Sequence, residues 1–136
     1  MARMASIIRQ AAIAAPAAKC WDAVRAFGAL HERLAPGFVT ALTMTAEGER
    51  RITFFTGAVA TEFLIGVDEQ AMRLACTVTE SPLGATFYCA SSQVIPEGAA
   101  ACRFVRAIDV LPAELGPRIG ELLEAGLRAI TATLSS

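Results

Sequence analysis

Six runs of alternating or mostly apolar residues, each with strand-forming character, occupy the middle of the chain and constrain its fold more than any other feature. They cover residues 38–46, 50–56, 59–67, 73–80, 86–95 and 101–110. Glycine, proline or charged turn residues separate them, and every connection is short enough to close a hairpin. Because hairpins join strands that run in opposite directions, the sequence predicts an antiparallel sheet whose strands follow chain order.

Further elements flank this series. Residues 6–14 form an apolar, β-compatible run, residues 17–27 then carry apolar side chains at helical spacing, and a second short helix is expected over 29–34. After Pro112 leucine and isoleucine recur at the period of a long amphipathic helix. The order predicts an α+β fold in which a seven-stranded curved antiparallel sheet, two short helices after strand 1 and a long C-terminal helix enclose an apolar cavity. At 136 residues, we expect a single domain, 1–136.

Composition narrows the classes of partner. The formal net charge is only -1 and the basic residues are spread along the chain, which argues against a nucleic-acid surface. None of Cys20, Cys76, Cys89 and Cys102 forms a C-x-x-C pair, so we expect packing roles, with no metal site and no cofactor. No apolar run reaches transmembrane or signal-peptide length, and a cytoplasmic location is the expectation.

Several segments together resemble one known family. They are IAAPAAKCWDAVRAFGAL, APGF, RRITFFTGAVATEFLIGVDE, VIPEGAAACRFVRAIDVLP and LLEAGLRAI, and they extend over nearly the whole chain. The chain is similar to the START-like (SRPBCC) superfamily, within its polyketide cyclase/dehydrase group of small bacterial proteins. The resemblance implies a helix-grip fold with a hydrophobic cavity between the sheet and the last helix. Its members include ligand carriers, aromatases and cyclases, and large aromatic residues are frequent near the positions of Leu34, Cys76 and Arg106.

Strand alternation gives a set of candidate ligand-binding residues that share the concave face of the sheet, together with two leucines of the last helix. Turns centred on residues 81–84 and 96–99 would place Cys76 opposite Cys89, and Cys89 opposite Arg106, while Tyr88 would point outward. A mostly apolar wall with a few polar groups is typical of a small-molecule site. The candidates are Phe54, Glu62, Leu64, Cys76, Phe87, Cys89, Ser91, Phe104, Arg106, Leu123 and Leu127.

The polar candidates permit two interpretations. Glu62 and Arg106 are expected to approach each other across the cavity, directly or through one water, either to orient a ligand or as a purely structural pair. A ligand with a carbonyl, phenolate or carboxylate end would then dock against Arg106. His31, the single histidine, is expected near the cavity entrance as a surface residue, because no partner for general-base catalysis is apparent in the sequence.

Three hypotheses for function follow. The first is a non-catalytic carrier or sensor that binds a lipid, isoprenoid or polyketide-like molecule. The second is an enzyme of the cyclase/aromatase type whose catalytic residues are unknown, with Arg106 and Glu62 as its candidates. The third is a protein-interaction module, because apolar residues such as Phe55 and Ile65 are expected on the outer face, where a homodimer contact is the alternative to scattered exposed hydrophobes.

Overall fold

The computed structural model describes residues 3–80 and 82–135, and it confirms the predicted helix-grip fold. Seven antiparallel strands form one sheet in the order β1-β7-β6-β5-β4-β3-β2. The strands are β1 (Ala5–Ile13), β2 (Val39–Ala46), β3 (Glu49–Phe54), β4 (Val59–Asp68), β5 (Arg73–Glu80), β6 (Phe87–Pro96) and β7 (Cys102–Leu111). The helices and short helical turns are α1 (Ala17–Arg25), η1 (Phe27–Ala29), η2 (Leu30–Leu34), η3 (Ala113–Leu115) and α2 (Gly116–Leu134).

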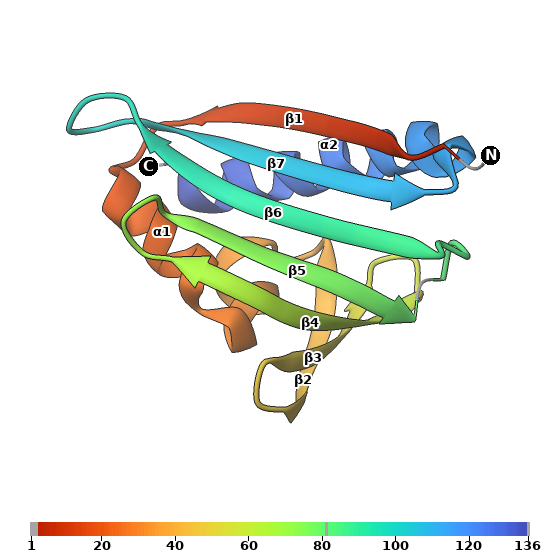
Figure 1. Cartoon of the computed structure of the whole chain (residues 1–136). Coiled ribbons are helices and arrows are strands. Elements are labelled where there is room, and N and C mark those ends of the chain that lie inside the picture. The colour runs from red at the N-terminus through yellow and green to blue at the C-terminus, as the bar shows by residue number, and fades with distance from the viewer. Residues whose placement is uncertain (1–2, 81, 136) are drawn as a thin grey trace.

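The sheet curves around α2, which lies along its inner face behind β7 and β6 (Figure 1). The segment from α1 to η2 covers the lower part of the same face, next to β2 and β3 (Figure 1). On α2 the buried residues recur every three or four positions, and they are Gly116, Ile119, Gly120, Leu123, Gly126, Leu127, Ile130 and Leu134. The amphipathic period read from the sequence therefore corresponds to the face of α2 that packs on the sheet.

Pro16 and Trp21 anchor α1. The carbonyl of Pro16 accepts hydrogen bonds from the amides of Lys19 and Cys20 and so begins the hydrogen-bond ladder of the helix. Trp21 is buried, and its indole Nε1 donates to Oε2 of Glu69 at 2.8 Å. This bond fastens α1 to the turn between β4 and β5, so one wall of the interior is held at a fixed position.

Two buried thiols meet where α1 contacts the start of β7. Cys20 and Cys102 are both free cysteines, and their Sγ atoms lie 3.3 Å apart in the main hydrophobic core. Burial, followed by the hydrogen bond between the two thiols, raises the pKa of Cys20 to about 12. The expected contact between Cys76 and Cys89 is not formed, because Cys76 lies opposite Ala90.

The connection between β5 and β6 displaces the predicted register by one residue. Thr86 lies outside the β5–β6 ladder because its amide and hydroxyl both donate to the carbonyl of Leu111 on β7. Gly84 turns the chain with a φ of +78°, and Ser81, where the predicted turn begins, lies outside the described residues. A shift of one residue reverses the face of every side chain on a strand, so Tyr88, not Cys89, faces inward.

The connection between β6 and β7 is also longer than predicted. The two strands pair out to Pro96 and Cys102, and the amide of Glu97 donates to the carbonyl of Ala101 at 2.9 Å across the turn. Ser92, rather than Cys89, therefore lies opposite Arg106. The predicted inward face of β7 is retained, whereas that of β6 is wrong.

Candidate functional site

A cavity of about 280 Å³ lies between the concave face of the sheet, α2 and the segment from α1 to η2. This volume is close to the lower end of the roughly 300–1,000 Å³ that small-molecule pockets enclose. Its walls are mainly aliphatic and aromatic, and polar side chains are few. The described residues with polar side chains that line it are Arg50, Thr56, Glu62, Cys76, Tyr88, Ser92, Arg106 and Arg118.

The structure brings part of the predicted candidate set together around this cavity. The candidates that line it are Phe54, Glu62, Cys76, Arg106, Leu123 and Leu127. They come from four strands and from α2. Their side chains all face the interior, so the inward face predicted for each of these residues is correct.

The other five candidates do not line the cavity. Phe87, Cys89 and Ser91 belong to the outward-facing set of β6, and Phe87 is 46% exposed. Phe104 does point inward, but it is completely buried in the core. Leu64, in the middle of β4, is partly buried and packs against that core.

Tyr88 and Ser92 are the residues of β6 that face the cavity, in place of the predicted Phe87, Cys89 and Ser91. Both line the cavity, and the prediction that Tyr88 points outward is wrong. Burial raises the pKa of the Tyr88 phenol to about 12, although the nearby positive charge of Arg106 acts in the opposite direction. The phenol is therefore protonated at neutral pH and can donate a hydrogen bond inside the cavity.

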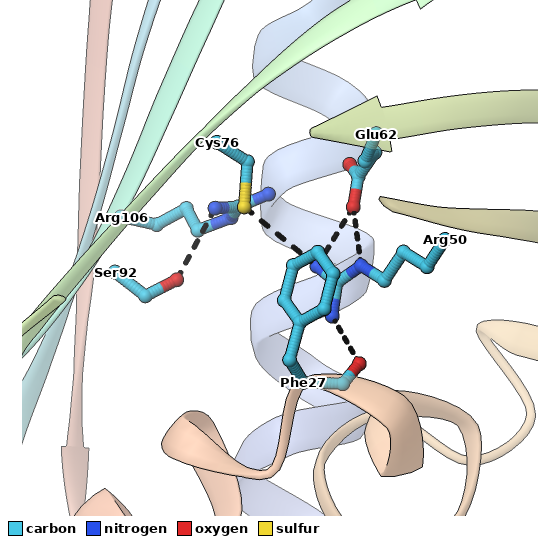
Figure 2. Close-up of polar contacts among 6 residues, drawn as sticks. All are labelled: Phe27, Arg50, Glu62, Cys76, Ser92 and Arg106. Atoms are coloured by element: carbon cyan, nitrogen blue, oxygen red, sulfur yellow. Dashed lines mark hydrogen bonds and ion pairs between the residues drawn. The ribbon is translucent and has the colours of Figure 1, made fainter. Parts of the chain in front are cut away.

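Arg50 and Glu62 form a buried ion pair between β3 and β4, where they are direct cross-strand neighbours. Oε1 of Glu62 accepts from Nε of Arg50 at 2.8 Å and lies 2.7 Å from its Nη2. The remaining Nη1 of Arg50 donates to the carbonyl of Phe27 at 2.8 Å, and the Phe27 ring stacks 4.0 Å from the guanidinium carbon (Figure 2). Arg50 thus joins the sheet to the helical segment that covers the cavity.

Arg106 points into the cavity from β7, as predicted, but the predicted direct pair with Glu62 is wrong. Its Nη1 donates to the Ser92 hydroxyl at 3.2 Å, and no carboxylate of the described residues lies within ion-pair distance of it (Figure 2). Glu62 is instead occupied by Arg50. Between these groups lies Cys76, whose thiol pKa is raised to about 11 by burial and then by the charge of Glu62.

The exposed members of the lining locate the mouth of the cavity. Thr56 follows β3, Pro82 lies in the connection from β5 to β6, and Arg118 is in the first turn of α2. Arg118 is half exposed and pairs with Glu121 at 3.2 Å along the helix. The mouth therefore opens beside the N-terminal end of α2. It lies away from the contact between Arg50 and Phe27.

His31 does not belong to this cavity. Its Nε2 lies 3.1 Å from Oε1 of Glu32, and its Nδ1 is buried without a hydrogen-bond partner among the described residues. Across the described part of the chain, no group of three or more histidine, cysteine, aspartate or glutamate side chains is placed to hold a metal ion. Within the same residues, no helix has the length and apolar character required to span a membrane.

Solved structures of proteins of different kinds have the same fold as this chain. An uncharacterised protein of Bacillus thuringiensis matches with a TM-score of 0.87 at 15% identity, over 96% of this chain and 98% of that chain. Norcoclaurine synthase of Thalictrum flavum, a point mutant in complex with a transition-state analogue, matches with a TM-score of 0.78 at 24% identity, over 98% and 96%. The di-domain ARO/CYC protein BexL of the BE-7585A biosynthetic pathway matches with a TM-score of 0.82 at 15% identity, over 95% of this chain but only 46% of that one.

These likenesses show the fold, whereas the sequence itself identifies the family. No protein of curated function matches the sequence significantly. The family profile described as polyketide cyclase/dehydrase and lipid transport matches residues 4–135, which is almost the entire chain. The chain therefore belongs to the polyketide cyclase/dehydrase and lipid transport family of the START-like superfamily.

Proposed function

We propose that residues 1–136 act as one domain that binds a hydrophobic small molecule in the cavity, as a non-catalytic carrier or sensor. The observation that carries this proposal is the enclosed volume of about 280 Å³ with its mainly apolar wall. Each 100 Å² of apolar ligand surface removed from water there would favour binding by roughly 2.5 kcal/mol, before the costs of association are subtracted. The description of the family, which includes lipid transport, supports the same conclusion.

The state of the polar groups supports a carrier over an enzyme. Tyr88 and Cys76, with pKa values raised to about 12 and about 11, keep their protons at neutral pH and are poor bases and nucleophiles. Glu62 is held by the guanidinium of Arg50. None of the described residues that line the cavity is a histidine. Free buried cysteines are also consistent with the reducing cytoplasm that we propose as its location.

A cyclase or aromatase is the second candidate, and the observation that favours it is the position of Arg106 and Tyr88. Both are hydrogen-bond donors at the cavity wall, where together they could polarise a carbonyl of a polyketide-like chain. The likeness to an ARO/CYC protein and to norcoclaurine synthase agrees with this alternative at the level of the fold. A reaction would be recognised by loss of water from an incubated poly-β-keto compound.

The third candidate, an interaction module, depends on the outer face. Phe55, in the turn after β3, and Ile65, on β4, are 55% and 58% exposed. Native mass spectrometry of the purified protein would report a homodimer and any bound cargo in one measurement. A monomer that carries a hydrophobic compound supports the first candidate, whereas an empty dimer supports the third.

Binding is tested by titration with N-phenyl-1-naphthylamine, a neutral apolar fluorophore. The structure offers a matched pair of variants on β5: Val78 lines the cavity, whereas the neighbouring Thr79 is exposed on the other face. We expect Val78→Trp to abolish binding because the indole would fill the cavity, and Thr79→Trp to bind as the wild type does. If the wild-type protein does not bind the fluorophore, or if both variants bind it equally, the cavity is not the binding site.

A further inference from the structure

We propose that the ligand is an anion, a hydrophobic molecule with a single carboxylate that is bound by Arg106 together with Tyr88 and Ser92. This inference rests on the proposed function, because it requires that the cavity receive a ligand. It adds the chemical class of that ligand and the residues that select it.

The first argument is the balance of charge inside the cavity. Of the described residues, three from the strands line it with charged side chains: Arg50, Glu62 and Arg106. Arg50 and Glu62 neutralise each other through contacts of 2.7 and 2.8 Å. Arg118 lies at the mouth and has its own partner in Glu121. The interior is therefore left with one positive charge, that of Arg106.

The second argument is the environment of that charge. Arg106 lies between Phe104 and Ile108 on the inward face of β7. Both of these neighbours are buried, and Arg106 itself is partly buried. A charged group that is withdrawn from water without a counter-charge costs several kcal/mol, and an opposite charge is the partner that offsets most of this cost. The single hydrogen bond from Arg106 to the neutral Ser92 hydroxyl does not provide one. A ligand with a negative charge would.

The third argument is the complementarity of hydrogen bonds. The guanidinium has five N–H donors, and the bond to Ser92 uses one, so several remain for a carboxylate. Ser92 accepts that bond and keeps its own proton to donate. Tyr88 lines the same cavity, and burial keeps its phenol protonated. A carboxylate, which only accepts hydrogen bonds, fits such a group of donors, and a cationic ligand would be repelled by Arg106.

The neighbouring residues decide where the anion would bind. Ser92 lies directly opposite Arg106 on β6, and Tyr88 is four residues before Ser92 on the same face, towards the mouth. The carboxylate of a ligand would therefore sit against the β6–β7 part of the sheet. Its apolar part would occupy the aliphatic region formed with α2 by residues such as Leu123 and Leu127.

The test compares two probes of nearly the same size and shape by isothermal titration calorimetry: 1-naphthaleneacetate, which is an anion, and 1-naphthaleneacetamide, which is neutral and carries N–H donors. For the wild-type protein we expect the carboxylate to bind at least about tenfold more tightly than the amide. Arg106→Met should remove that preference by weakening only the carboxylate. Arg103→Met is the matched control, because Arg103 is on the same strand but on the outer face, where it is 41% exposed and pairs with Glu97. It should leave both affinities unchanged.

Each outcome distinguishes this inference from the proposed function. If N-phenyl-1-naphthylamine binds to the wild type but the carboxylate binds no more tightly than the amide, the anionic class is wrong and the binding function stands. If the wild type binds none of the three probes, the proposed function itself fails. If Arg106→Met does not fold, Arg106→Gln removes the same charge while retaining a polar group. The preference of the wild type for the carboxylate over the amide is measured without any variant. A preference that persists in the variant would overturn the role of Arg106.

Discussion

The replacement of Glu62 by glutamine examines the buried ion pair most directly. The side chains of Arg50 and Glu62 are only 8% and 6% exposed, so Glu62→Gln leaves a guanidinium in the interior without its counter-charge. Removal of one partner from a buried pair typically costs about 3–5 kcal/mol. We expect the free energy of unfolding to fall by about that amount, because nothing else in the described structure is within ion-pair distance of Arg50.

Arg50→Met should cost as much or more, since it also removes the hydrogen bond to the carbonyl of Phe27 and the contact with the Phe27 ring. The double variant Arg50→Met/Glu62→Leu removes both charges together. Its remaining cost should be about 1–3 kcal/mol, the penalty for a carbonyl at Phe27 that has lost its donor. The two substitutions should therefore be strongly non-additive, with the double variant more stable than the sum of the single effects predicts.

Urea unfolding followed by far-UV circular dichroism measures these changes as shifts in midpoint at a constant m-value. Glu124→Gln is the control, because Glu124 pairs with Arg9 between β1 and α2 but both side chains are about half exposed. It should change the free energy of unfolding by less than about 1 kcal/mol. A loss below about 1 kcal/mol in Glu62→Gln, or simple additivity in the double variant, would refute the interpretation of Arg50–Glu62 as a mutually dependent pair.

Three other predictions concern α2 and the cavity wall. Leu123→Ala should cost about 2–5 kcal/mol, towards the lower end because Leu123 already borders the cavity, and a loss below about 0.5 kcal/mol in urea unfolding would show that α2 is not tightly packed there. Gly120→Ala should raise the free energy of unfolding by up to about 1 kcal/mol, because the one close neighbour of the added methyl is the flexible end of Arg9, at 3.1 Å, and Ile7 lies at an ordinary contact distance of 3.9 Å. A lower thermal midpoint would contradict this. Burial raises the pKa of Cys76 from 9.0 to about 11 and that of Tyr88 from 10.0 to about 12, so the folded form holds both protons more tightly. Their contribution to the free energy of unfolding is fully present below about pH 9 and is lost as the pH rises towards 12. The double variant Tyr88→Phe/Cys76→Ala should therefore show a flatter pH dependence of the free energy of unfolding in that range.

The element order was predictable because the turns and the helical periods are plainly marked in the sequence. The inward face of β7 was predictable too, since Phe104, Ile108 and Val110 share one parity with Arg106, and those apolar residues are buried. On β6 both parities carry apolar residues, so alternation could not decide between Tyr88 and its neighbours. The inward face of β6 therefore depends on the lengths of the two flanking turns. Hydrogen bonds of Thr86 and Glu97 determine these lengths, and the residue composition of the turns does not reveal them.

The Arg50–Glu62 pair was missed for a related reason. The predicted strands 50–56 and 59–67 leave a two-residue link at positions 57–58, and such a link does not bring Arg50 and Glu62 into register. In the structure the amide of Phe54 donates to the carbonyl of Ala58 at 2.8 Å, and this wider turn makes Arg50 and Glu62 direct neighbours. A buried carboxylate needs a cation beside it, and both Arg50 and Arg106 share the cavity-facing side of the sheet with Glu62. The sequence offered no means to choose between Arg50 and Arg106.

The position of β1 at the edge of the sheet has a consequence for synthesis on the ribosome. Strands β2 to β6 can pair with one another in the order in which they emerge, whereas among the described strands β1 pairs only with β7. Ala5 pairs with Val110 and Ile13 with Cys102, so the first strand must wait until residues 102–110 have been translated. Until then the nascent protein exposes β6 as an unpaired edge and the inner face of the sheet without α2, and both are sites where nascent chains associate. The emergence of residues 102–134 is therefore the step at which a chaperone could release the chain safely.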